Sequence, residues 1–183
     1  MTVYDYMSRV IRECKEYVEN FKNEKGSILF TGNTGCGKTF LSNCIARELI
    51  RRYFSVVYLT ATDMFDILAG SRFNGGDDDE AKDRAAYILD CDLLIIDDFL
   101  TVGIDSDAAS DLFAVLANRE HRAPTMIVSQ SGPGYWVEAL PDRVAADSIV
   151  NRLAHHAREI KLGSVDMRKT RDEEARASDG HWE

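Results

Sequence analysis

The sequence contains no long hydrophobic run. No stretch of its 183 residues approaches the ~20 consecutive apolar residues of a membrane span, and the amino terminus has no continuous apolar segment typical of a secretory signal. The 4 cysteines include no CxxC pair and no histidine partner at zinc spacing, which argues against a disulfide framework or a structural metal. We therefore expect a protein of the reducing cytoplasm with no membrane segment.

Positive charge is also scarce. The chain has 22 Lys and Arg against 31 Asp and Glu, a net charge of -9. Such a surface repels nucleic acid as a whole, so contact with DNA has to come from a local basic patch or from assembly of subunits. The basic candidates are Arg47, Arg51, Arg52, Arg119, Arg122 and residues 168–171.

Apolar residues at steps of three and four predict an amphipathic helix over residues 3–21, whose apolar stripe either packs on the core or docks a partner helix. Strands and helices then alternate. The predicted strands are 27–30, 55–60, 92–97, 125–130 and 158–162, and the predicted helices are 38–52, 62–69, 81–90, 106–119 and 142–157. The first four strands are apolar on both faces, so they are expected to be inner strands.

This alternation predicts a three-layer α/β fold with a central, mostly parallel, five-stranded sheet. We divide the chain into a helix and lead-in (1–24), a core (25–169) and a charged, flexible tail (170–183). The acidic stretch 73–80 is expected to be an exposed loop.

The stretch "GNTGCGKT" matches the phosphate-binding pattern G-x-x-x-x-G-K-[ST] and lies between a predicted strand and a predicted helix. Its glycines let backbone N–H groups turn around phosphates, and the helix amino terminus adds a favourable dipole. Lys38 is expected to reach the β- and γ-phosphates, and Thr39 to bind Mg²⁺. The predicted nucleotide contacts are Gly32, Asn33, Thr34, Gly35, Cys36, Gly37, Lys38, Thr39 and Phe40.

Two acids end the apolar strand "LLIIDD". Asp97 is the predicted Mg²⁺ acid, and Asp98 is placed to polarise the attacking water, unless it only caps a turn. If strand 125–130 neighbours the loop strand, Gln130 lies near the γ-phosphate as a polar sensor, or it is an ordinary strand-end residue. Because the guanine-reading N-K-x-D motif is absent, the predicted nucleotide is ATP.

With these residues the chain resembles the IstB-like and DnaC/DnaI-like ATPases, the AAA+ helicase-loader and transposition-helper clade. The stretches "GSILFTGNTGCGKTFLSNCIARELI" and "SVVYLTATDMFDIL" are similar to helicase loaders, while "DLFAVLANR" and "IVNRLAHHAREIKLGSVDMRK" are more similar to transposition helpers. The resemblance spans residues 4–169. It implies that the predicted α/β fold is that of a P-loop NTPase, with an AAA+ ATPase core over residues 25–169. It also implies an ATP-dependent, oligomeric assembly factor on DNA, with a replicative helicase or a transposase as partner.

The resemblance also implies roles for two arginines. Arg152 is similar to the arginine finger that reaches the ATP of a neighbouring subunit, and Arg168 to a second sensor that contacts phosphate within its own subunit. The alternative for each is a solvated surface charge.

The chain departs from the family pattern at several points. It begins almost at the ATPase module, so no amino-terminal docking domain is expected, and the short segment 163–183 leaves no room for a helical lid. Ser148 stands where helicase loaders often carry a further Arg, and Asp98 is shorter than the Glu of fast AAA+ hydrolases. Slow turnover is therefore expected.

Cys36 lies within the loop, and we expect an exposed, reactive thiol whose alkylation blocks nucleotide binding unless it is merely a tolerated filler. Two other functions stay open from the sequence. One is a nucleotide-gated interaction switch with negligible hydrolysis. The other is a small-molecule kinase, which the missing Arg-rich lid after residue 98 disfavours.

Overall fold

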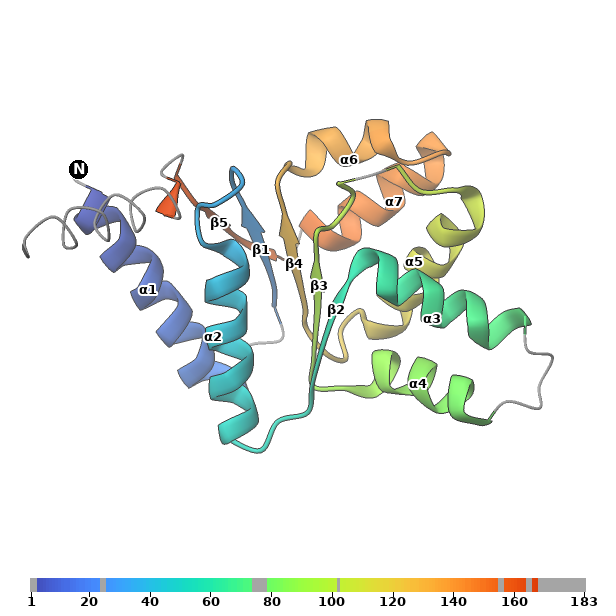
Figure 1. Ribbon diagram of the computed structural model, residues 1–183, viewed down its shortest axis with the longest axis horizontal. Helices are drawn as coiled ribbons and strands as arrows, with labels where there is room; N and C mark the ends of the chain where they lie inside the picture. The colour runs from blue at the N-terminus through green and yellow to red at the C-terminus, as the bar shows by residue number, and fades with distance from the viewer. Residues whose placement is uncertain are drawn as a thin grey trace, which may run out of the picture.

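The computed structural model describes residues 3–23, 26–73, 79–101, 103–154, 157–163 and 166–167. Its centre is a five-stranded sheet in the order β2-β3-β4-β1-β5, in which every neighbouring pair is parallel (Figure 1). The strands are β1 (Ser27–Thr31), β2 (Val56–Thr60), β3 (Leu93–Asp97), β4 (Thr125–Ser129) and β5 (Ala157–Lys161). The predicted α/β fold with a parallel five-stranded sheet is confirmed.

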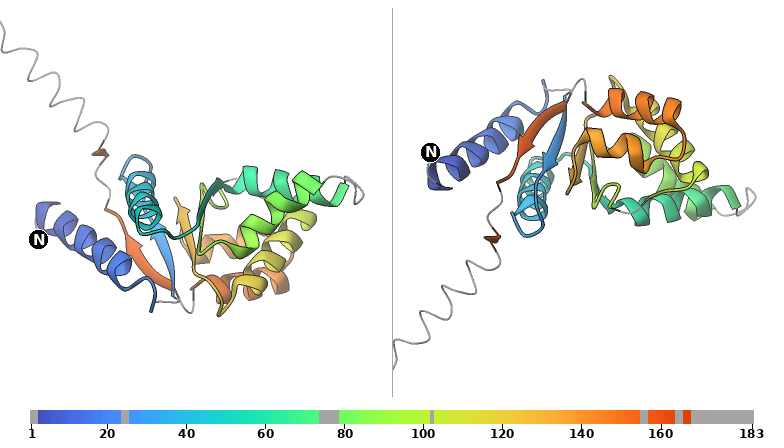
Figure 2. Two further views of the ribbon diagram at one scale, coloured as in Figure 1. Left: turned by 90° about the horizontal axis from the view of Figure 1, so that it is seen from below. Right: turned by 90° about the horizontal axis from the view of Figure 1, so that it is seen from above.

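Seven helices among the described residues cover the sheet in two layers (Figures 1 and 2). They are α1 (Val3–Asn20), α2 (Lys38–Arg51), α3 (Ala61–Phe73), α4 (Asp79–Asp90), α5 (Ser106–Arg119), α6 (Pro133–Ala139) and α7 (Arg143–Ala154). Helices α1 and α2 pack on one face, and α3 to α7 pack on the other. No helix of the described part is long and apolar enough to cross a membrane.

Strand β3 shows why the apolar runs become inner strands. All five of its residues are buried. Leu93 and Ile95 join the core on the α1–α2 side, whereas Leu94 and Ile96 join the core on the opposite side. A strand with helices on both faces has no solvated side, so it needs apolar residues at successive positions.

Helix α1 packs its apolar stripe on the core. Val10 and Tyr17 are 1% and 0% exposed and belong to the same cluster as Leu49 of α2. Phe21, just after the helix, meets Phe54 edge to face with ring centroids 4.8 Å apart. Of the two roles considered for the stripe, the structure shows core packing.

Several element predictions need correction. Strand β2 is an edge strand of intermediate burial, not an inner one, because only β3 pairs with it. Helix α6, which begins at Pro133, was not predicted. Helix α7 ends at Ala154, and Ala157 already belongs to β5. The loop predicted over 73–80 is shorter, because Phe73 still belongs to α3 and Asp79 already begins α4. Residues 74–78, Arg168 and the tail 170–183 lie outside the described residues.

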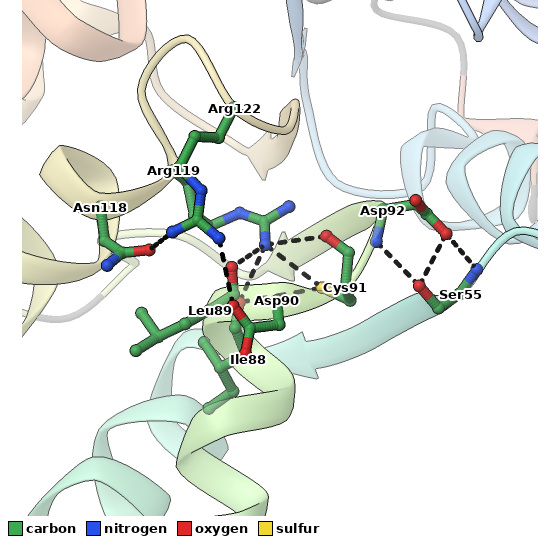
Figure 3. A network of polar contacts seen from close by, with 9 residues as sticks. All are labelled: Ser55, Ile88, Leu89, Asp90, Cys91, Asp92, Asn118, Arg119 and Arg122. Carbon is green, nitrogen blue, oxygen red and sulfur yellow. Dashed lines mark hydrogen bonds and ion pairs between the residues drawn. The ribbon is translucent and has the colours of Figure 1, made fainter.

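Arg119 is a structural residue and not a surface charge, so its assignment as a DNA contact is wrong. Only 1% of it is exposed. Its guanidinium donates to the carbonyl oxygens of Ile88, Leu89 and Cys91, at the end of α4 and just after it (Figure 3). It also donates to the hydroxyl of Thr125 and to the carbonyl oxygen of Pro124, at the start of β4. Burial lowers its pKa, and these neutral acceptors compensate the charge.

Candidate functional site

The glycine-rich loop joins the carboxyl end of β1 to the amino end of α2, the place where open parallel sheets bind ligands (Figure 1). Gly37, with φ of 97°, caps α2, and this left-handed backbone is one that a residue with a Cβ rarely adopts. Gly32 has φ of 147°, and a Cβ there would lie 2.6 Å from the carbonyl oxygen of Leu162. The backbone therefore requires glycine at both motif positions.

Lys38 is buried in the loop, with 8% of its surface exposed. Its Nζ donates to the carbonyl oxygens of Gly32 at 2.6 Å and Asn33 at 2.9 Å. None of the ion pairs found within the described part of the chain involves this ammonium group. A buried cation held by neutral carbonyls, beside a helix amino terminus, makes a site for an anion.

Asp97 accepts three hydrogen bonds at the end of β3, where it is 5% exposed. Its Oδ2 accepts from the hydroxyls of Thr39, at 2.9 Å, and of Tyr58. Its Oδ1 accepts from the backbone N–H of Asp98 at 2.8 Å. Burial, followed by the hydrogen bond to this carboxylate, raises the pKa of Tyr58 to about 12, so the phenol is a proton donor at neutral pH.

The hydroxyl of Thr39 and the carboxylate of Asp97 form a hard oxygen donor set. Mg²⁺ prefers such ligands and commonly takes one or two from the protein, with phosphate and water completing the octahedron. The two predicted metal ligands are therefore together in the structure and fit this cation.

Asp98 is exposed and has φ of 52°. The residue after it anchors the segment: Phe99 is fully buried, and its N–H donates to the carbonyl oxygen of Val128 at 3.0 Å. Its ring meets Trp136 of α6 edge to face at 4.9 Å. Asp98 thus lies between two fixed neighbours at the carboxyl edge of the sheet.

Gln130 follows β4, which pairs with β1 as predicted. Its Oε1 accepts a hydrogen bond of 2.9 Å from the Thr34 hydroxyl, so the structure brings it to the loop. Ser129 before it is buried and donates to the carbonyl oxygen of Phe99. Phe40, in the first turn of α2, is 71% exposed.

The thiol of Cys36 is buried, with 3% exposure, which corrects the expectation of an exposed thiol. Its Sγ lies 3.8 Å from Nζ of Lys38, and the residue belongs to the apolar cluster that α1 and α2 share.

Arg152 lies at the other end of the sheet. It forms an ion pair with Glu120, and its guanidinium carbon is 5.1 Å from the ring centroid of Phe113. It lines a cavity of about 500 Å³ together with Ser27 and Thr125, the first residues of β1 and β4. Since β1 has five residues, roughly 13 Å separates this end from the loop. Arg152 does not reach the loop of its own chain.

Tyr58 is the site residue that sequence reasoning missed. It stands in the apolar-looking stretch "VVYLT" and matches no motif. Only the parallel pairing of β2 with β3, which aligns Thr60 with Asp97, places its hydroxyl at the carboxylate.

The proteins to which this chain is similar in sequence include ATP-binding proteins of insertion sequences and helicase loaders. A family described as "IstB-like ATP binding protein" matches residues 5–175. An insertion sequence IS5376 putative ATP-binding protein of Geobacillus stearothermophilus is 31% identical over 162 residues, covering 87% of this chain and 63% of the relative. The replicative helicase loader DnaC of Escherichia coli K12 is 25% identical over 138 residues, covering 73% and 54%. The chain thus spans less than two thirds of the length of these relatives.

Solved structures share the fold. A crystal structure of DnaI superposes with a TM-score of 0.70 at 24% identity, covering 87% of this chain and 83% of that one. AMPPCP-bound DnaA from Aquifex aeolicus gives a TM-score of 0.71 at 19% identity, covering 93% and 51%. The fold is that of the P-loop AAA+ proteins.

Proposed function

The chain belongs to the family of IstB-like ATP-binding proteins, and on this premise we propose that it hydrolyses ATP slowly and uses the cycle to assemble or load partner proteins on DNA. Similar proteins carry the names of an insertion-sequence ATP-binding protein and a replicative helicase loader. The corresponding partners are a transposase and a replicative helicase.

The buried ammonium group of Lys38 carries this proposal. It occupies a glycine-lined loop and is held by two carbonyl oxygens, without a carboxylate partner among the described residues. The phosphates of ATP supply the missing negative charge. Thr39, the next residue along the chain, pairs with Asp97, and these two would hold a cation that neutralises phosphate charge.

Each residue then has a defined task. Lys38 turns from the loop carbonyls to the β- and γ-phosphates, while the backbone N–H groups of residues 35–39 surround them. Mg²⁺, held by Thr39 and Asp97, would neutralise phosphate charge. Asp98 orients the attacking water and takes up its proton, and Gln130 donates its amide to the γ-phosphate.

The arginine finger is proposed to act between subunits. Arg152 lies at the amino edge of the sheet, away from its own loop, so it can reach only the ATP of a neighbouring subunit. There it would leave Glu120 and offset charge on the γ-phosphate, a contribution worth ~10³ or more in rate. Arg168, the proposed second sensor, lies outside the described residues.

Contact with DNA is proposed to depend on assembly. Arg47 and Arg51 are exposed on α2, whereas Arg52 is paired with Glu48 and Arg122 with Asp90. Arg47 and Arg51 are the exposed candidates without an ion pair among the described residues, and on a chain with net charge -9 they give weak, salt-sensitive binding. A ring or filament would repeat this patch.

The test is the rate of phosphate release per subunit, measured against protein concentration with Mg²⁺ and with or without single- and double-stranded DNA. We expect the specific rate to rise with concentration or with DNA. Lys38→Ala should abolish hydrolysis, because it removes the charge that binds the phosphates.

A nucleotide-gated switch is the alternative function, and the short, exposed side chain of Asp98 favours it. It predicts tight ATP binding, together with a phosphate-release rate that stays near background at every protein concentration, with or without DNA. That result would overturn the proposal that the chain hydrolyses ATP, but it would leave the proposal of a nucleotide-binding site intact.

A further inference from the structure

Tyr58 connects the edge strand β2 to the metal carboxylate of β3. Its ring packs against the apolar cluster on the α1–α2 side of the sheet, and the residue is of intermediate burial. Its hydroxyl extends beyond that cluster to Oδ2 of Asp97. The ring of Tyr58 is enough for packing against the apolar cluster, whereas its hydroxyl contacts the carboxylate of Asp97.

The hydroxyl shares its acceptor with the P-loop. Oδ2 of Asp97 accepts from both Tyr58 and Thr39, while Oδ1 accepts from the N–H of Asp98. A carboxylate has about four acceptor positions, so these three donors leave about one for a cation or its water. Three fixed donors also hold the carboxylate plane, because rotation about the Cβ–Cγ bond would break them together.

We propose that Tyr58 is a positioning residue for Mg²⁺·ATP, which it serves by fixing the rotation of the Asp97 carboxylate. Groups that hydrogen-bond to metal ligands set the orientation of those ligands, and their loss commonly costs 10- to 100-fold in metal affinity or activity. The inference rests on the proposed function, since it assumes that Asp97 serves the metal of a bound nucleotide.

A competing role predicts the opposite effect from the same geometry. If the phenol hydroxyl occupied a position on Oδ2 that the cation needs, it would compete with Mg²⁺ and would have to withdraw. Removing it would then strengthen metal binding. Whether Mg²⁺ binding weakens or strengthens when the hydroxyl is removed therefore decides between positioning and competition.

The experiment compares the full chain with its Tyr58→Phe variant, which keeps the packed ring and deletes only the hydroxyl. Binding of a fluorescent ATP analogue is measured in EDTA and across a Mg²⁺ titration. We expect the affinity in EDTA to stay within about twofold of wild type, because the phosphates bind the loop. The Mg²⁺ concentration for half of the affinity gain should rise about 10-fold or more.

Tyr87→Phe is the matched control, since this tyrosine lies on α4 and is 68% exposed. It should leave both quantities unchanged. Thermal melting of Tyr58→Phe should stay close to wild type, and an equal loss of affinity with and without Mg²⁺ would indicate general damage to the loop and overturn the inference.

The remaining outcomes separate the inference from the proposed function. If wild type gains affinity with Mg²⁺ and Tyr58→Phe gains it at the same concentration or a lower one, the positioning role is wrong and the ATPase proposal stands. If wild type binds the analogue without any Mg²⁺ dependence, or does not bind it, both are overturned.

Discussion

Lys38 and Asp97 are opposite charges buried at the same edge of the sheet, and neutral groups hold each of them. Carbonyl oxygens accept from the ammonium group, and hydroxyl and amide groups donate to the carboxylate. Dipoles compensate a buried charge only in part, so each group gains from an ion of opposite sign. A nucleotide with its cation would bring both ions at once, which agrees with the proposed function.

Cysteine reactivity provides a test at the residue scale. Cys44 is exposed on α2, whereas Cys14, Cys36 and Cys91 are buried. Burial raises the pKa of Cys14 to about 11 and also raises that of Cys91, so on the order of one Cys14 thiol in ten thousand is a thiolate at pH 7. We expect brief iodoacetamide treatment of the native protein, read by peptide mass spectrometry, to modify Cys44 first.

Denatured protein is the control, in which all of the cysteines should react at similar rates. Modification of Cys36 as fast as Cys44 in the native state would contradict its burial and restore the expectation of a reactive loop thiol.

At the scale of elements, periodicity and apolar runs predicted the helices and strands that a local sequence pattern specifies. The strand "LLIID" is apolar at successive positions. Helix α5 has the predicted bounds, and in the structure Asp105 caps its first turn by accepting from the N–H of Ala108. Helix α6 was missed because seven residues beginning Pro-Gly carry no repeated period. Trp136, fully buried, holds it in place.

Contacts between elements were beyond prediction for a related reason. The motif identified Lys38, Thr39 and Asp97, because each belongs to a short pattern that can be read locally. Tyr58 meets Asp97 only through strand register, and Arg119 meets the end of α4 only through tertiary packing. A single sequence, without the structure, does not reveal strand register or tertiary packing.

Arg119 gives a prediction at this scale. Arg119→Met fills similar space but leaves carbonyl oxygens of the α4–β3 turn and of Pro124 without their donor. We expect a loss of about 3 kcal/mol in the free energy of unfolding, measured by urea denaturation. Arg122→Met, at an exposed arginine, is the control and should change it by less than about 1 kcal/mol. Equal effects would mean that the buried network contributes little.

For the whole molecule, the two halves of the proposed catalytic apparatus lie at opposite ends of one sheet. The loop, Asp97 and Asp98 are at the carboxyl edge, and Arg152 lines the cavity at the amino edge. One subunit therefore cannot bring its own arginine to its own phosphates. In a head-to-tail assembly, the amino edge of each subunit faces the loop of the next, and such contacts build rings or filaments.

This arrangement predicts complementation between two inactive variants. Lys38→Ala destroys the nucleotide loop but keeps the arginine, whereas Arg152→Ala keeps the loop but lacks the arginine. Lys38→Ala alone should not hydrolyse ATP, and Arg152→Ala alone should do so at a rate reduced by about 10³ or more. In a mixture, an Arg152→Ala subunit can receive its arginine from a Lys38→Ala neighbour, so we expect activity to reappear and to peak near equal proportions.

The fraction of restored activity distinguishes a shared site from damage to each subunit. With random assembly, about half of the Arg152→Ala loops in an equal mixture face an intact arginine, and half of all subunits have an intact loop. Recovery should therefore approach about a quarter of the wild-type rate per total subunit. Mixing Arg152→Ala with Arg152→Lys is the control, because it supplies no guanidinium and should restore little. A mixture no more active than the sum of its components would show that Arg152 serves its own subunit or none.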